Sequence, residues 1–170
     1  SDKEFFTCNG IAVHIPGKKI VLRSVVPSDA EILYKWENDK TNWDVSGTKK
    51  SFTKKEIREF IANQKDIYLD KQLRLMIILP SPRPSPTVRS GQNEGSSVGC
   101  IDLFEFDKKK SGVGILIEKK YRKKGYASEA LSLLIKYSFK TLNLRELFCS
   151  ISTDNETSMK LFRKHKFKVT

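Results

Sequence analysis

The sequence predicts a mixed α/β domain, with a hairpin-rich sheet that carries helices on its faces. Short segments rich in β-branched residues alternate with segments whose apolar residues recur every three or four positions. The resulting order, β-α-α-β-β-β-α-β-α-β, is typical of a mixed sheet covered by helices. With 170 residues, of which 38% are hydrophobic, the chain is long enough to bury the core of one domain.

Six segments are predicted to be strands because they are rich in β-branched residues and partly alternate between apolar and polar positions. They are 18–26, 72–79, 96–107, 112–121, 146–152 and 166–170. Between the second and the third of these lies a stretch with four of the six prolines and almost no apolar residues. We expect a flexible loop over 80–97, joining two strands that pair as a hairpin.

Four segments are predicted to be helices, and they are 28–39, 51–64, 125–140 and 155–165. The first two begin with a capping box, in which a Ser or Thr precedes a Glu by three residues. The two pairs are Ser28 with Glu31 and Thr53 with Glu56. The third helix has one buried face at 3–4 spacing, made by Ala127, Ala130, Leu131, Leu134, Ile135 and Ser138. Residues 1–18 are expected to be an N-terminal extension of a single domain over 19–170.

The chain is strongly basic, with 32 Lys and Arg against 20 Asp and Glu and a formal charge of +12. This balance favours acidic partners such as phosphates or nucleic acid. The basic residues are spread over several elements, and neither an aromatic-plus-glycine RNA motif nor a zinc-finger spacing occurs. Nucleic acid is therefore not the expected partner, although a basic ribosome- or nucleic-acid-binding module stays open as an alternative.

The sequence is typical of a cytoplasmic protein. Its three cysteines are an odd, widely spaced set, which we interpret as reduced thiols. The sequence contains no apolar stretch of membrane-spanning length, and its polar start is no signal peptide, so no membrane partner is expected. Neither His14 nor His165 has a metal-ligand partner at a suitable spacing, so no metal is assigned. A homo-oligomer stays open.

Residues 118–131, EKKYRKKGYASEAL, place five Lys or Arg directly before Gly125 and a helix start. Backbone N–H groups at a helix N-terminus lack intrahelical partners, and the helix dipole favours negative charge there. A glycine permits close approach of a ligand, so the stretch is suited to cradle a phosphate. The Walker and dinucleotide glycine patterns are both absent. From these residues alone, a basic turn at a helix start explains the stretch equally well.

Residues 19–169 resemble the GNAT superfamily of acetyl-CoA-dependent N-acetyltransferases, and in particular its branch of spermidine and ribosomal-protein-alanine acetyltransferases. The family pattern R/Q-x-x-G-x-G/A is matched by Arg122, Gly125 and Ala127. The pattern N-x-x-S/A-x-x-L-Y/F-x-x-x-G-F is matched through Asn155, Ser158, Phe162 and Phe167. The resemblance implies a mixed, mostly antiparallel sheet with a V-shaped split between its two central strands and helices on both faces.

The resemblance also implies acetyl-CoA as co-substrate. Backbone amides of 123–127 would hold the pyrophosphate, and backbone groups of the preceding strand would line the pantetheine arm and polarise the thioester carbonyl. Asn155 would hydrogen-bond the pantetheine, while Ser158 and Phe162 would border an open thiol end. The cofactor-binding residues implied are Ile115, Leu116, Ile117, Arg122, Lys123, Lys124, Gly125, Tyr126, Ala127, Asn155 and Phe162.

The acceptor implied by the resemblance is a primary amine that attacks the thioester directly in a ternary complex. The candidate catalytic residues are Asp102, Glu105 and Ser158, and the candidate substrate-binding residues are Trp36, Asp44 and Glu105. Because Asp102 and Glu105 are three residues apart, they point to opposite faces of an unbulged strand. A solvated hairpin face explains either carboxylate equally well.

Two departures from the family affect the mechanism. Many relatives have a Tyr at Phe162 that protonates the leaving thiolate, and a Glu near Gly112. An amine of pKa about 10.4 costs roughly 4–5 kcal/mol to deprotonate at pH 7, whereas an α-amine near 7.7–8 costs about 1 kcal/mol. Because the Tyr and the Glu are missing, the favoured acceptor is a peptide or protein N-terminus or a weakly basic small amine. The carboxylates of Asp102 and Glu105 favour a polyamine instead. A catalytically weak or inactive CoA-binding regulator is the other alternative.

Overall fold

The computed structural model describes residues 12–39, 51–81, 95–151 and 155–170, and there it contains one six-stranded sheet. The strands lie in sequence order: β1 (His14–Pro16), β2 (Val21–Ser24), β3 (Leu73–Pro80), β4 (Gly95–Phe104), β5 (Lys110–Ile117) and β6 (Glu146–Phe148). Neighbouring strands are antiparallel, except that β5 and β6 are parallel. The predicted mixed, mostly antiparallel sheet is confirmed.

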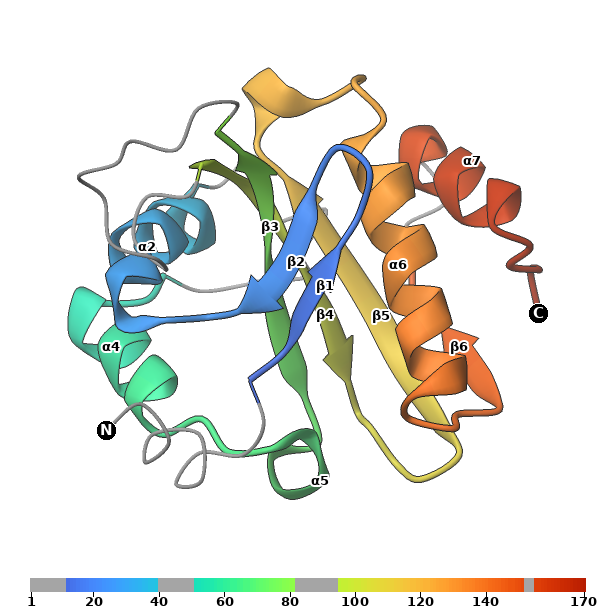
Figure 1. Ribbon diagram of the computed structural model, residues 1–170, viewed down its shortest axis with the longest axis horizontal. Helices are drawn as coiled ribbons and strands as arrows, with labels where there is room; N and C mark the ends of the chain where they lie inside the picture. Colours follow the sequence, from blue (N-terminus) through green and yellow to red (C-terminus); the bar gives the residue numbers. More distant parts are fainter. Residues whose placement is uncertain (1–11, 40–50, 82–94, 152–154) are drawn as a thin grey trace.

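Helices cover both faces of the sheet, as predicted. They are α2 (Ala30–Asn38), α4 (Lys54–Ala62), α5 (Ile67–Asp70), α6 (Tyr126–Lys140) and α7 (Glu156–Lys164), with 3₁₀ turns η1 (Pro27–Asp29) and η3 (Lys119–Tyr121). In Figure 1, α2 and α4 lie to the left of the strands, and α6 and α7 lie to the right.

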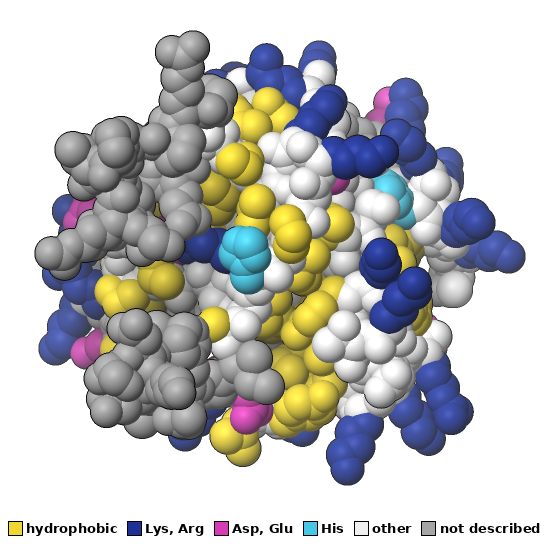
Figure 2. All heavy atoms as spheres, in the orientation of Figure 1, with side chains coloured by type: hydrophobic (Ala, Val, Ile, Leu, Met, Phe, Trp, Pro, Cys, Tyr) yellow, Lys and Arg dark blue, Asp and Glu magenta, His cyan; other side chains and the backbone are white. Residues whose placement is uncertain are grey.

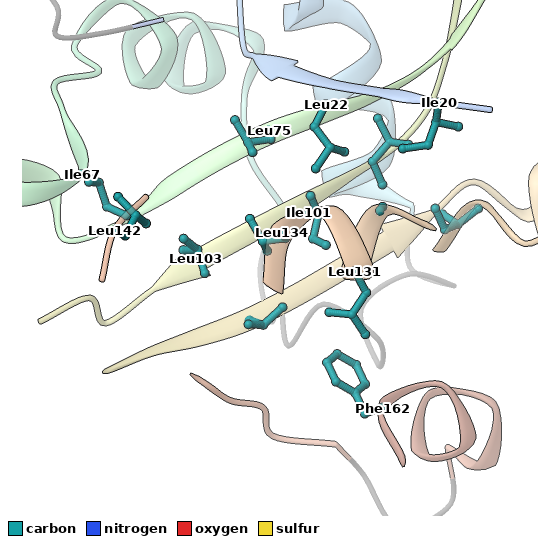
Figure 3. Close-up of a cluster of buried hydrophobic side chains, with 14 of the residues drawn as sticks. Ile20, Leu22, Ile67, Leu75, Ile101, Leu103, Leu131, Leu134, Leu142 and Phe162 are labelled. Atoms are coloured by element: carbon teal, nitrogen blue, oxygen red, sulfur yellow. The ribbon is translucent and has the colours of Figure 1, made fainter. Parts of the chain in front are cut away.

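Strand β3 is apolar over most of its length because both of its faces are buried. Leu75 and Ile77 belong to the core beneath α6, whereas Met76 and Ile78 belong to the core beneath α2 and α4. This division follows from the two-residue period of a strand. Figure 3 shows the first of these cores, with side chains of the sheet meeting those of α6.

The sheet splits between β5 and β6. The two strands pair at three positions, of which the last is Gly112 with Phe148, while β5 continues to Ile117. The predicted strand over 146–152 is therefore cut short at Phe148, because β5 has turned away from it. This is the V-shaped split that the resemblance implies, although β6 is the outermost strand of the described sheet rather than a central one.

No strand forms at 166–170, so that prediction is wrong. Lys166 has φ 69°, in the left-handed region, and turns the chain back. The amide of Phe167 donates to the carbonyl of Phe162 at 3.0 Å, and the two rings pack edge to face with centroids 5.0 Å apart. Phe167 is thus held against α7, and residues 167–170 form no strand.

The two predicted capping boxes have different outcomes. Thr53 and Glu56 form theirs at the start of α4, with both hydrogen bonds at 3.1 Å, which confirms the prediction. The box of Ser28 with Glu31 is wrong, because α2 begins only at Ala30. Asp29, rather than Ser28 and Glu31, makes the side-chain hydrogen bonds at this turn. Its carboxylate accepts from the amide of Val26 at 2.9 Å and from the guanidinium of Arg23.

Several strand ends also differ from the predictions. Strand β4 stops at Phe104 because Glu105 has φ 47°, and β5 stops at Ile117 because a 3₁₀ turn follows it. The edge strand β1 was not predicted. The predicted hairpin of β3 with β4 is confirmed, with pairing up to Pro80 opposite Gly95. Most of the loop expected over 80–97 lies outside the described residues.

Candidate active site

The turn between β5 and α6 is shaped by two residues in the left-handed region. Lys123 has φ 63° and Gly125 has φ 84°. The Nε of Arg122 donates to the carbonyl of Ile117 at 2.8 Å, which ties the turn back to the end of β5. Gly125 is the N-cap of α6, and nothing lies within 4 Å of the place where its Cβ would be. The backbone there faces open space.

The N-terminus of α6 presents a row of backbone donors. Glu129 is the first residue of α6 whose amide donates to the preceding turn. Its acceptor is the carbonyl of Gly125, at 3.1 Å. In the described part of the chain, none of the amides of 123–128 donates to a backbone acceptor outside the helix. The positive end of the helix dipole lies at the same place. The cradle 123–128, as we call these residues, is therefore suited to bind an anion.

The edge of β5 that faces the split carries further backbone donors and acceptors. The amide of Glu118 donates to the carbonyl of Val98 on β4 at 2.8 Å. Because hydrogen bonding alternates along an antiparallel pair, the backbone groups of Leu116 also face β4, and those of Val113, Ile115 and Ile117 face the split. The carbonyl of Ile117 already accepts from Arg122. An extended polar chain that entered the split would meet the backbone of Ile115 and Val113.

A cavity of about 410 Å³ lies on the α2 and α4 face of the sheet. Its described lining comes from α2, α4 and the neighbouring strands β3 and β4, and consists of Glu37, Phe52, Glu56, Ile57, Phe60, Gln72, Leu73, Arg74, Asp102, Leu103 and Phe104. This acceptor cavity, as we call it, has aromatic walls and a group of charged side chains. Its described lining contains three carboxylates and one guanidinium.

Arg74 links two of the carboxylates of the acceptor cavity. Its Nε and Nη2 donate to the two oxygens of Asp102, each at 3.0 Å, and its Nη1 donates to Glu37 at 2.7 Å. The guanidinium also lies over the ring of Phe60, 5.9 Å from its centroid. Burial alone would lower the pKa of Arg74, but the charges of Asp102 and Glu37 outweigh it and hold that pKa well above its usual value. Arg74 therefore stays charged, and both carboxylates are fixed in place.

Phe104 is one of the residues that line the acceptor cavity. Its Cα partner on β5 is Gly112, whose partner on β6 is Phe148. The ring of Phe104 lies over Gly112 so closely that a Cβ there would overlap it, and it packs edge to face on Phe148 with centroids 5.9 Å apart. The Phe104 ring leaves no room for a side chain at position 112.

The structure places the predicted acceptor residues in different environments. Asp102 lines the acceptor cavity, whereas Glu105 is exposed in the turn after β4 and is not among the residues that line it. Trp36 is 3% exposed, in the core between α2, α4 and the sheet, and does not belong to the described lining either. Asp44 lies outside the described residues.

The predicted residues of α7 lie on the other face of the sheet. Asn155 is the N-cap of α7, and its Oδ1 accepts from the amide of Ser158 at 3.2 Å. Phe162 is 4% exposed and points toward Leu131 of α6 (Figure 3). The expected openness at Phe162 is wrong, because the ring is part of the core; that Phe162 borders the thiol end stays a prediction.

Sequence reasoning did not select Arg74 or Phe104. Arg74 is the one charged residue in the apolar run LRLMIIL, and a charge in a strand buried on both faces requires a partner. That signal could have identified it. No comparable signal marks Phe104, because its role depends on the strand register that brings it over Gly112.

On the face of the molecule that Figure 2 shows, the Lys and Arg side chains are spread rather than gathered in one patch. Figure 2 shows Lys and Arg side chains around the rim of the visible face, with hydrophobic side chains between them. Within the described residues, no group of three or more His, Cys, Asp and Glu is arranged to hold a metal ion. No helix in this part of the chain is both long and apolar enough to cross a membrane.

Comparisons with known proteins agree on one family. The acetyltransferase (GNAT) domain family matches residues 19–168. The uncharacterised N-acetyltransferase YnaD of Bacillus subtilis (strain 168) is 24% identical over 155 residues, which cover 89% of this chain and 81% of that protein. The spermidine N(1)-acetyltransferase of Escherichia coli (strain K12) is 31% identical over 78 residues, which cover 45% of this chain and 42% of that protein.

A solved structure shares the fold. The spermidine N-acetyltransferase from Vibrio cholerae, in complex with CoA and spermine, superposes with a TM-score of 0.72. The match covers 86% of this chain and 79% of that one, at 16% sequence identity. The likeness concerns the arrangement of the strands and helices described above.

Proposed function

Because this chain belongs to the GNAT family and is an acetyl-CoA-dependent N-acetyltransferase, we propose that its acceptor is a cationic primary amine bound in the acceptor cavity. The observation that carries the proposal is the charge of that cavity, whose described lining has three carboxylates and one guanidinium. A cavity with a net negative charge attracts an ammonium group and disfavours an acidic acceptor.

The cradle 123–128 and the open edge of β5 are the parts of the chain suited to hold acetyl-CoA. The amides of the cradle would bind the pyrophosphate, with Lys123 and Lys124 adding positive charge. The backbone of Ile115 would contact the pantetheine arm and donate to the thioester carbonyl as charge develops on its oxygen. The side-chain amide nitrogen of Asn155 would donate to the same arm, while its oxygen caps α7.

The acetyl group would pass directly from the thioester to the amine. The amine first loses a proton to solvent, and its neutral nitrogen attacks the carbonyl carbon. The new C–N bond forms, the C–S bond breaks, and the proton released from the nitrogen passes to the leaving thiolate, which gives the CoA thiol. No Ser, Thr, Cys or His is among the described residues that line the acceptor cavity. Cys100, two residues before Asp102, is buried, and this burial raises the pKa of its thiol to about 12. At neutral pH it is a poor nucleophile, which favours direct transfer.

Asp102 and Glu37 would hold an ammonium group of the acceptor other than the reacting nitrogen, rather than act as mobile bases. Both already accept hydrogen bonds from Arg74, so they are positioned anions. Several carboxylates around one cavity suit an acceptor with more than one positive charge, so a polyamine fits better than a singly charged amine. A peptide N-terminus is the competing acceptor, since its α-amine loses a proton at lower cost.

The test is acetyl transfer to an amine panel, followed by mass spectrometry. The panel contains spermidine, 1,4-diaminobutane, butylamine and a peptide with a free N-terminus. We expect spermidine and 1,4-diaminobutane to be acetylated with a higher kcat/KM than butylamine. A peptide acetylated in preference to all three amines would contradict the polyamine assignment.

A substitution in the acceptor cavity tests where the acceptor binds. Glu37→Gln should raise the KM for spermidine by about tenfold, the factor that corresponds to 1.4 kcal/mol, and leave the Kd for acetyl-CoA unchanged. Glu59→Gln is the matched control, because Glu59 lies on α4, pairs with Lys55 and is not among the residues that line the cavity. Equal KM values in the two variants would place the acceptor elsewhere.

A further inference from the structure

Two glycines on β5 leave its backbone without side chains on the face of the acceptor cavity. Gly112 and Gly114 are two residues apart, so they lie on the same face of the strand. In the register of the sheet, Gly112 is opposite Phe104 and Gly114 is opposite Asp102. Both partners on β4 line the acceptor cavity. The two glycines are not themselves among the described lining residues, but the register places them next to Phe104 and Asp102, which are.

The two glycines differ in what covers them. The ring of Phe104 fills the space over Gly112, whereas a Cβ added at Gly114 would meet only a ring atom of Phe104, at 3.7 Å. That distance is an ordinary van der Waals contact. Gly114 is therefore the uncovered position, and the edge of the Phe104 ring is its boundary.

The position of the Phe104 ring is set by three strands. Phe104, Gly112 and Phe148 are in register across β4, β5 and β6, and the two rings meet nearly at right angles, with an interplanar angle of 88°. A side chain held on both sides in this way does not swing aside at low cost, because it would lose its contacts with Phe148 and Gly112 together.

We propose that Phe104 is a specificity-determining residue, whose ring limits the opening at Gly114 to slender, unbranched amines. The inference rests on the proposed function, since it takes the acceptor cavity as the place where the amine binds. An amine held by Asp102 reaches the β5 backbone over Gly114, directly opposite in the sheet. A linear chain passes the ring edge, and a branch next to the reacting nitrogen collides with it.

The test compares 1,4-diaminobutane with 2,5-diaminohexane, in which the carbon next to each nitrogen carries a methyl group, using kcat/KM for each. One methyl group at a fitted site changes the ratio of two such kcat/KM values by about 10–200-fold. We expect the wild type to prefer the linear amine, Phe104→Leu to reduce the preference, and Phe104→Ala to reduce it by about tenfold or more. Gly114→Ala should act in the opposite direction, because its methyl group narrows the same opening. The Kd for acetyl-CoA should stay unchanged in the Phe104 variants.

Phe106→Leu is the matched control. Phe106 lies two residues beyond Phe104, is 3% exposed in the core on the opposite face, and packs edge to face on Tyr68. Its truncation loosens the same hairpin without touching the acceptor cavity, so the preference should not change. The melting temperature of each variant identifies any that fail to fold, and Phe104→Leu, the milder change, then carries the test.

The outcomes separate the two proposals. If the wild type acetylates both diamines and the preference is the same in folded Phe104 variants, Phe104 does not set specificity and the inference is wrong. If Phe106→Leu changes the preference as much as Phe104→Leu does, the effect comes from the loosened hairpin, and the inference is again wrong. If the wild type acetylates neither diamine, the proposed acceptor class is wrong and the inference falls with it.

Discussion

Arg74 and Asp102 face each other across adjacent strands and share two parallel hydrogen bonds. They are Cα partners on β3 and β4, and the guanidinium donates Nε to Oδ1 and Nη2 to Oδ2, each at 3.0 Å. The side chain of Arg74 is 22% exposed, so the pair is partly shielded from water. Such a bidentate pair fixes the orientation of the Asp102 carboxylate as well as its distance from Arg74. It sets where the negative charge of the acceptor cavity lies.

We predict that Arg74→Met destabilises the fold more than Arg74→Lys does. Removing one partner of a buried ion pair costs about 3–5 kcal/mol, and the partial exposure here reduces that amount. Lys keeps the charge but not the fork, so it should recover part of the stability. Denaturant unfolding measures both. A double-mutant cycle of Arg74→Met with Asp102→Asn should show a coupling of about 1 kcal/mol, and additive effects would contradict the pairing.

We predict that Gly125→Asp abolishes acetyl-CoA binding while the fold persists. The position has φ 84° and open space around its Cβ, so the carboxylate would lie where an anion should bind. Gly125→Asn is the control, because Asn has the same shape, tolerates the left-handed region and has no charge. Calorimetry should give a Kd at least about tenfold weaker for the Asp variant than for the Asn variant. Equal affinities would remove the phosphate-cradle assignment.

Phe162→Tyr is expected to lower stability without raising turnover. The added hydroxyl enters a core in which Phe162 is 4% exposed, and an unpaired buried hydroxyl costs about 1–3 kcal/mol. Phe167→Tyr is the control, since that ring is only half-buried and its hydroxyl can reach water. Unfolding curves and steady-state rates measure the two effects. A stable Phe162→Tyr enzyme with a higher kcat would show that the hydroxyl reaches the thiol end, as the family resemblance implies.

Replacing residues 81–94 with a two-residue Asn-Gly turn should change neither the melting temperature nor the affinity for acetyl-CoA by much. Strands β3 and β4 pair up to Pro80 opposite Gly95, so their ends are already close. Closing a shorter loop also costs less entropy. Thermal unfolding and calorimetry provide the comparison. A large drop in melting temperature would show that the segment contributes contacts that its composition does not predict.

Much of the fold follows from local patterns in the sequence. The apolar spacing of α6, the capping box of Thr53 with Glu56 and the hairpin of β3 with β4 were all predicted and are all present. Each depends on residues that are near in sequence or on a periodicity that burial imposes. The turn before α6 belongs to the same group, because a glycine after a basic run and before helix formers marks a helix start.

The predictions that failed depended on which segments meet in space. The 166–170 segment has the composition of a strand, but Lys166 turns it back onto Phe162. Ser28 and Glu31 have the spacing of a capping box, but Asp29 can reach Arg23 on the neighbouring strand β2 and takes its place. The first contact is local, since Phe162 and Phe167 are five residues apart at the end of α7, whereas the second joins Asp29 to the strand β2.

The sequence by itself determined the family, the order of most elements and the cradle before α6, because these are written in local patterns and motif spacing. Only the tertiary structure decided the acceptor cavity. Glu37, Arg74 and Asp102 come from one helix and two strands, and Phe104 meets Gly112 and Phe148 only through the register of three strands. The ion pairs of Arg74 and the covering of Gly112 by Phe104 depend on distances between separate segments. The spacing of residues along the sequence does not give these distances.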